Sequence, residues 1–139
     1  MNRRTFLSAI GAGSLVGVGG CTSIFDEKRS VELLQVGVLN WTDEATSARV
    51  RVLLDEDVVA DVTYDLEAEG DGRVLDCTWP SDPGQFVVSA RLQEDDDWET
   101  RDLADPDSDC AALWVMIERS DGPPSMPISR DCEFYADRC

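Results

Sequence analysis

Three aspartates occupy alternate positions in one segment of the sequence: Asp105, Asp107 and Asp109. Their spacing matches the first three ligand positions of a calcium-binding loop. Such a loop also needs glycine at its sixth position and a bidentate glutamate at its twelfth, where this chain has Cys110 and Met116. The segment is therefore not an EF-hand, and we interpret it either as a solvated acidic surface or as part of a cation site in an end loop.

Residues for catalysis are scarce in this chain. It has no histidine, which excludes Ser-His-Asp and Cys-His nucleophile systems and metal sites with a histidine ligand. It has no glycine-rich phosphate loop, and its carboxylates are so numerous that no pair stands out as a glycosidase pair. We therefore expect a protein that is not an enzyme and that has no metal or other cofactor.

The tryptophans supply a second type of candidate binding residue. Trp98 follows four acidic residues and is the ring best suited to an exposed position. Together with Asp105, Asp107 and Asp109 it defines a candidate end-loop site for a cation or a carbohydrate. Trp114 lies within an apolar run, where we expect a core residue.

A candidate modification site lies at Asn40-Trp41-Thr42, which is an N-glycosylation sequon. Export of the chain would allow a glycan on Asn40. The alternative interpretation is a strand end at which Trp41 belongs to the core.

The first 21 residues contain two spaced motifs, Arg3-Arg4-Thr5-Phe6-Leu7 and Val18-Gly19-Gly20-Cys21. The first resembles the twin-arginine export motif, carried by Arg3, Arg4, Phe6 and Leu7, and the second is similar to the lipobox of prokaryotic lipoproteins. The resemblance implies export in a folded state, cleavage before Cys21 and lipidation of its sulfur. A cleaved leader in which Cys21 is an ordinary thiol is the alternative.

The uncharged stretch between the two motifs favours a cleaved leader over a retained membrane anchor. A helix over Phe6–Gly20 would span roughly 22 Å, short of the ~30 Å hydrocarbon core. We therefore divide the chain into a signal peptide helix over residues 1–20, a lipidated cysteine with a short tether over residues 21–30, and one domain over residues 31–139. The expected location is the extracellular face of the cell membrane, with the lipid as the membrane contact.

Four cysteines remain after Cys21: Cys77, Cys110, Cys132 and Cys139. An even number in an oxidising compartment predicts two disulfides. Cys110 and Cys132 flank a candidate hairpin, so we expect that pair, with Cys77–Cys139 holding the C-terminus on the sheet. Each bond would stabilise the fold by roughly 3 kcal/mol. A four-cysteine zinc site is the alternative, although the chain has no C-x-x-C spacing.

The excess of acidic residues indicates the salt environment in which the chain folds. It has 29 acidic and 12 basic residues, with a net charge of −17, and Lys28 is the single lysine. High acid content and scarce lysine, together with the leader, resemble secreted proteins of halophilic archaea. Such a charge destabilises the fold unless salt screens it, so we expect cooperative folding in molar salt and loss of structure below about 0.5 M. It also excludes nucleic acids and anionic membrane surfaces as partners.

The hydrophobic pattern argues for a folded all-β domain and against disorder. The chain is 42% hydrophobic, and its apolar residues recur with a period of two, which is typical of half-buried strands. The expected strands are 31–41, 48–54, 58–66, 74–79, 86–92, 98–103, 110–118 and 126–132, with Glu69–Gly72 in a loop. Arg49 and Arg51 should form cross-strand ion pairs with Asp61 and Asp65.

About eight strands at short spacing predict a single antiparallel β-sandwich, with an eight-stranded barrel as the alternative. The segment Pro83-Gly84-Gln85-Phe86-Val87-Val88 resembles the start of a late strand in immunoglobulin-like and transthyretin-like extracellular modules. The resemblance implies an immunoglobulin-like sandwich.

These observations lead to two functional hypotheses. The first is a non-catalytic, surface-anchored lipoprotein that mediates binding or forms part of the cell envelope, with a partner that the sequence does not name. The second is a ligand-binding lipoprotein that holds a cation or a carbohydrate near Trp98 and Asp105–Asp109. A hydrolase that uses carboxylates is a third class, and it has no identifiable site.

Overall fold

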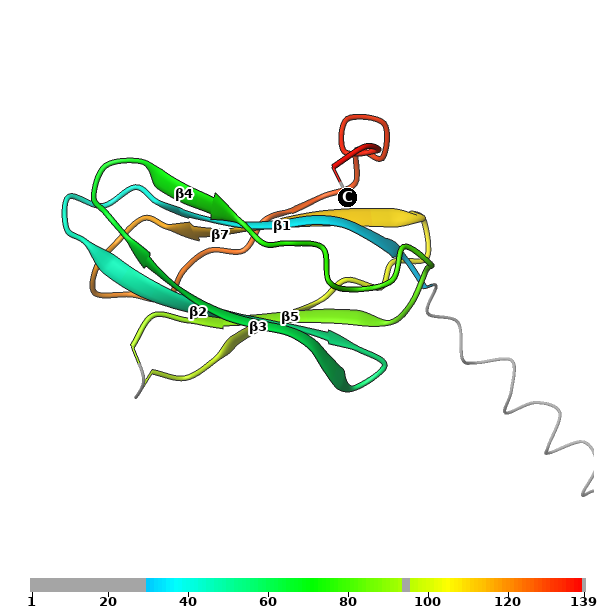
Figure 1. Cartoon of the computed structure of the whole chain (residues 1–139), viewed down its shortest axis with the longest axis horizontal. Coiled ribbons are helices and arrows are strands. Elements are labelled where there is room, and N and C mark those ends of the chain that lie inside the picture. The colour runs from blue at the N-terminus through cyan, green and yellow to red at the C-terminus, as the bar shows by residue number, and fades with distance from the viewer. Residues whose placement is uncertain (1–29, 94–95, 139) are drawn as a thin grey trace, which may run out of the picture.

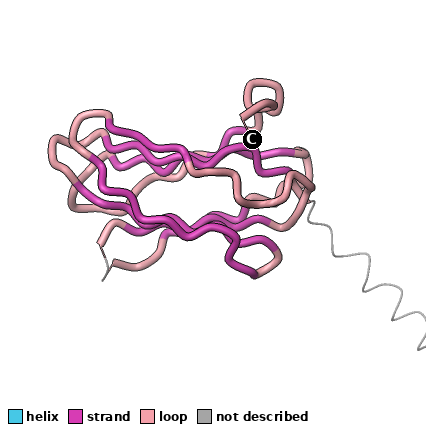
Figure 2. The backbone as a smooth tube through the Cα atoms, viewed as in Figure 1, coloured by secondary structure: helices cyan, strands magenta, loops and turns pink. Residues whose placement is uncertain are grey.

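Two four-stranded β-sheets face each other in the computed structural model, which describes residues 30–93 and 96–138 (Figures 1 and 2). The prediction of an all-β chain that forms a sandwich is confirmed for this part of the chain. The strands are β1 (Glu32–Asn40), β2 (Thr46–Leu54), β3 (Asp57–Leu66), β4 (Asp71–Val74), β5 (Phe86–Arg91), β6 (Glu99–Asp102), β7 (Cys110–Ile117) and β8 (Ile128–Ser129).

The two sheets have the orders β4-β1-β7-β8 and β3-β2-β5-β6. All pairs in the second sheet are antiparallel, but β1 and β7 run parallel, which the prediction of a wholly antiparallel sandwich did not include. Parallel neighbours need a long crossover connection. Here the whole of the second sheet lies between β1 and β7 in the sequence and provides that connection.

Alternating side chains fill the space between the sheets. Val50 and Val52 of β2 are fully buried, as are Phe86 and Val88 of β5, while the residues between them face outward. The opposite wall is equally apolar; its fully buried members include Val36, Val38, Leu113, Val115 and Ile117. The period-two prediction is therefore confirmed for β2 and β5.

The position of β4 differs from the prediction. The strand covers Asp71–Val74 and pairs with β1, whereas the sequence pattern placed a loop at Glu69–Gly72 and a strand at 74–79. A Cβ atom on Gly72 would lie 2.9 Å from Leu39 Cδ1, so the glycine allows close packing on β1. The last strand is likewise shorter than the expected 126–132, because β8 pairs with β7 at only two positions.

Two tryptophans lie outside the core, Trp114, which the sequence pattern placed there, and Trp41, for which a core position was the alternative interpretation. The side chain of Trp41 is 56% exposed. Trp114 is half-buried on the outer face of β7, opposite Gly37 of β1. A Cβ atom on Gly37 would lie 2.5 Å from the Trp114 ring, so the ring covers a position at which only glycine fits. Apolar period-two patterns do not distinguish the inner face of a sheet from an apolar outer face.

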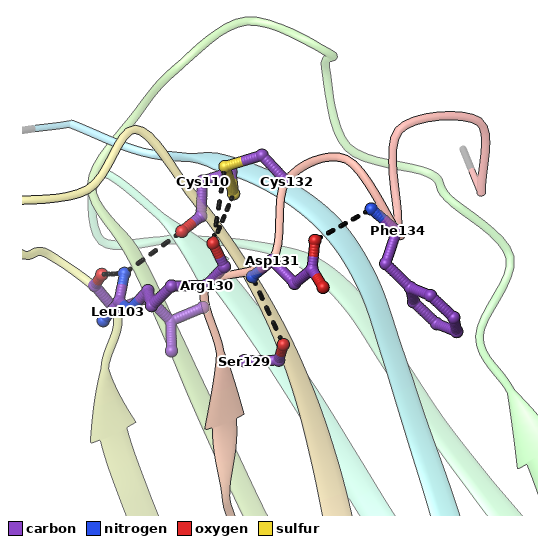
Figure 3. The surroundings of a disulfide bond; sticks show 7 residues. All are labelled: Leu103, Cys110, Ser129, Arg130, Asp131, Cys132 and Phe134. Atoms are coloured by element: carbon purple, nitrogen blue, oxygen red, sulfur yellow. Dashed lines mark hydrogen bonds between the residues drawn. A yellow bond between two sulfur atoms is a disulfide. The ribbon is translucent and has the colours of Figure 1, made fainter.

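The disulfide between Cys110 and Cys132 is confirmed, with the two Cα atoms 5.8 Å apart (Figure 3). It joins the start of β7 to the segment after β8, and the β7–β8 hairpin places the two cysteines opposite each other. Cys77 is also disulfide-bonded. Its predicted partner, Cys139, lies outside the described residues.

The leader likewise lies outside the described residues, and with it the expected signal peptide helix, the export motif and Cys21. Within residues 30–93 and 96–138, no helix is long and apolar enough to cross a membrane.

Candidate functional site

The outer face of the β3-β2-β5-β6 sheet gathers arginines around one tryptophan. Arg49 and Arg51 are outward residues of β2, and Arg91 ends β5 directly opposite Arg49. Asp61 of β3 lies opposite Arg51, and Trp98 immediately precedes β6. We call these five residues the arginine–tryptophan face.

The three guanidinium groups of this face lie over the Trp98 ring. The guanidinium carbons of Arg51 and Arg91 are each 4.6 Å from the ring centroid, and that of Arg49 is 5.7 Å away. These are cation–π distances, and each contact is worth about 0.5–1 kcal/mol at an exposed site. The half-buried ring is therefore covered by cations and does not form the bare stacking platform that the carbohydrate hypothesis requires.

Asp61 holds two of these arginines in place. Arg49 donates from Nε and Nη2 to its two carboxylate oxygens, at 2.8 Å each, and Arg51 Nε donates at 3.2 Å. The hydrogen bonds from Arg49 are the main reason why the pKa of Asp61 falls from 3.8 to about 2. The predicted cross-strand ion pairs are thus confirmed for Asp61, whereas Asp65 lies opposite Ser47.

Replacing Asp61 with Asn should change the acid dependence of stability. Because the folded-state pKa of Asp61 is lowered, its stabilising contribution is fully present above about pH 4 and is lost as the pH falls toward 2. The side chain is 30% exposed, so we expect Asp61→Asn to lose less than about 1 kcal/mol at neutral pH, and this loss should shrink to nothing as the pH falls through 2.

Urea unfolding across this pH range, at constant salt, measures the difference. Asp65→Asn, on the same strand, controls for the removal of one negative charge. Parallel pH curves for the wild type and Asp61→Asn would show that the ion pairs contribute nothing.

A small hollow of about 150 Å³ adjoins this face. Among the residues that the structure describes, its lining consists of hydrogen-bond donors and one apolar side chain, with no acidic residue: Ser47, Arg49, Thr63, Arg91, Leu92 and Gln93. We call it the Arg91 hollow. The larger hollows of about 370, 510 and 520 Å³ all have acidic linings, and the first of them also includes Arg91.

Arg91 differs from the neighbouring arginines in its partners. Arg49 and Arg51 both bind Asp61, whereas in the described part of the chain Arg91 makes a cation–π contact with Trp98 and forms no ion pair. Arg91 was not among the site residues predicted from the sequence. Its outward position follows from the alternation of β5, but only the register of β5 against β2 places it beside Arg49.

The predicted end-loop site does not assemble. Trp98 precedes β6, whereas Asp105, Asp107 and Asp109 follow it, at the opposite end of that strand. Asp105 forms an ion pair with Arg130 at 3.6 Å and accepts a hydrogen bond from the Asp107 amide at 2.7 Å. Among the described residues, no group of three or more Cys, Asp or Glu side chains is arranged to hold a metal ion.

Asn40 of the sequon is fully buried. Its Nδ2 donates to the carbonyl oxygens of Glu44 at 2.9 Å and Glu67 at 3.0 Å, while its Oδ1 accepts from the amide of Thr42 at 3.0 Å. Both amide hydrogens are thus used inside the fold. A glycan on Asn40 would have to be attached before the chain folds.

The fold and this surface define an all-β sandwich with an arginine-rich outer face on one sheet. Compared with known proteins, the chain matches no family model, no curated protein and no solved structure. The proposals below therefore depend on this chain alone.

Proposed function

We propose that the chain is a non-catalytic binding module, held at the extracellular face of the cell membrane by a lipid on Cys21. Support for the location comes from the twin-arginine and lipobox motifs of the leader. We also propose that the sandwich is immunoglobulin-like, since the Pro83-Gly84 segment leads directly into β5, and that the protein is halophilic.

The arginine–tryptophan face is the observation that carries the binding role. The net charge of −17 repels anionic partners over most of the surface. This face instead concentrates three arginines against one carboxylate, that of Asp61. Their contacts with Trp98 and Asp61 hold the side chains in fixed positions, which lowers the entropy cost of binding. We propose that the partner binds here.

Crosslinking on intact cells in native salt tests whether the protein binds an envelope partner and whether that partner binds at the arginine–tryptophan face. A photo-crosslinking residue at Thr63, which is exposed beside this face, should capture an envelope partner. The same residue at Val74, which is 49% exposed on the outer face of the other sheet, is the matched control and should capture much less. Equal capture at the two positions would contradict a role for the arginine–tryptophan face.

The anchor has its own test in the same cells. Cys21→Ser should release the protein into the medium, because the variant lacks the sulfur that the lipid requires. A variant that stays as membrane-bound as the parent would place the anchor elsewhere.

A further inference from the structure

We propose that the Arg91 hollow binds the carboxylate group of an acidic saccharide. This inference extends the proposed binding function by naming a ligand class and the residue that contacts it. It rests on three features of the hollow: its lining, the state of the Arg91 side chain and the strands below it.

The lining of the hollow suits an anion in an otherwise acidic molecule. Arg49 and Arg91 supply positive charge, and Ser47, Thr63 and Gln93 supply neutral hydroxyl and amide groups. Hydroxyl and amide groups both donate and accept hydrogen bonds, as the hydroxyls of a sugar do. With about 150 Å³, the hollow is much smaller than the ~300–1,000 Å³ of pockets that enclose a whole drug-sized ligand. It therefore fits one charged substituent of a larger molecule.

Within residues 30–93 and 96–138, the guanidinium of Arg91 contacts Trp98 and pairs with no carboxylate. Its carbon lies 4.6 Å from the centroid of the Trp98 ring, and this cation–π contact restrains the group without using its N–H donors in an ion pair. Those donors form a fork that matches the two oxygens of a carboxylate. At molar salt the Debye length is about 3 Å, so only direct contact of this kind resists screening.

The strands beneath the hollow favour a saccharide over a peptide. Peptides commonly bind sheets by adding a strand at an open edge, where main-chain hydrogen bonds provide affinity. Ser47 and Arg49 belong to β2, which is already paired with β3 and β5, and Arg91 ends β5, which is paired with β2 and β6. Recognition at this place therefore depends on side chains, which suits a ring that carries hydroxyls and a carboxylate.

Equilibrium binding of polygalacturonate to the full-length protein, in detergent micelles and molar KCl, tests this proposal. The wild type should bind the acid form and not the fully methyl-esterified form, which lacks the charge. Arg91→Gln should weaken binding about tenfold or more, because hydrogen bonds between charged groups are lost. Arg91→Lys should weaken it similarly, because lysine keeps the charge but lacks the fork.

Arg101→Gln is the matched control. It removes an arginine from β6 of the same sheet, opposite inward-facing Val88 and away from the hollow, so binding should change less than about twofold. Thr63→Glu is a second variant, which places a carboxylate at the exposed rim of the hollow and should also abolish binding. Thermal melts in the same salt verify that each variant is folded.

Three results would overturn the inference: equal binding of the acid and the ester, unchanged binding by both Arg91→Gln and Thr63→Glu, or tighter binding of polyglutamate than of polygalacturonate. If any of them occurs while the crosslinker at Thr63 still captures a partner, this inference fails and the proposed binding function stands. If the crosslinker also captures nothing, both fail.

Discussion

Asn40→Asp is expected to lower the free energy of unfolding by about 3–4 kcal/mol. Asn40 is fully buried and donates to two carbonyl oxygens, those of Glu44 and Glu67. Aspartate would place a carboxylate oxygen against both carbonyls, so two hydrogen bonds would be lost and that oxygen would be buried against acceptors, while only the other oxygen keeps its donors in Thr42. A typical domain has only about 5–15 kcal/mol of stability, so the loss is a large fraction of it.

The size of this effect follows from the position of Asn40 between two loops. Its main-chain oxygen accepts from the Gly70 amide at 2.7 Å, and its Oδ1 also accepts from the Thr42 hydroxyl at 2.7 Å. One side chain thus joins the end of β1 to the loop before β2 and to the turn before β4. The asparagine and threonine of the sequon are explained by these contacts.

Chemical unfolding in molar KCl measures the loss. Thr42→Ser preserves both the hydroxyl and the sequon and should stay within about 1 kcal/mol of the wild type. Asn40→Ala removes the same hydrogen bonds without adding a charge. Its free energy of unfolding should lie between those of Asn40→Asp and Thr42→Ser. An Asn40→Asp variant as stable as Thr42→Ser would show that the buried amide does not support the loops.

Patterns local in the sequence predicted much of this fold. Arg49 and Arg51 alternate with buried valines. Asp61 lies on the same outward face of the next strand, so the ion pairs could be predicted from a single hairpin. The disulfide between Cys110 and Cys132 was predictable for the same reason, since the two cysteines lie on either side of the same β-hairpin. In such cases the partners are close in sequence and the turn fixes the register.

Contacts between distant segments could not be predicted in this way. The parallel pairing of β1 with β7 depends on the arrangement of the whole sandwich. The gathering of Arg49, Arg51 and Arg91 around Trp98 requires two registers at once, β2 with β5 and β5 with β6. Trp98 was predicted to be an exposed ring, whereas it is half-buried beneath three arginines. Its neighbours were predicted wrongly, because strand β6 lies between Trp98 and Asp105 and places them at its opposite ends.

Lowering the salt concentration is expected to have the largest effect, the loss of cooperative structure below about 0.5 M KCl. The net charge of −17 opposes compaction at low ionic strength. Asp61 and Asp105 form ion pairs with arginines, but exposed pairs of this kind contribute at most about 1 kcal/mol each. Repulsion among the other carboxylates should therefore exceed this attraction, and the free energy of unfolding should rise with salt.

Urea unfolding at a series of KCl concentrations measures the midpoint of this transition, and sucrose in place of salt separates screening from general stabilisation of buried surface. A stable fold in dilute buffer would contradict the prediction.

A charge-reduced variant locates the cause of the salt dependence. Asp43, Glu118 and Asp121 line one hollow with Trp41, so their negative charges lie close together. Replacing these three acids with their amides should move the midpoint to a lower KCl concentration, since the amides keep the shape and remove the repulsion. Exchanging Asp and Glu at the same positions keeps the charge and should leave the midpoint unchanged. If both variants move it equally, packing at this hollow and not electrostatic repulsion controls the salt dependence.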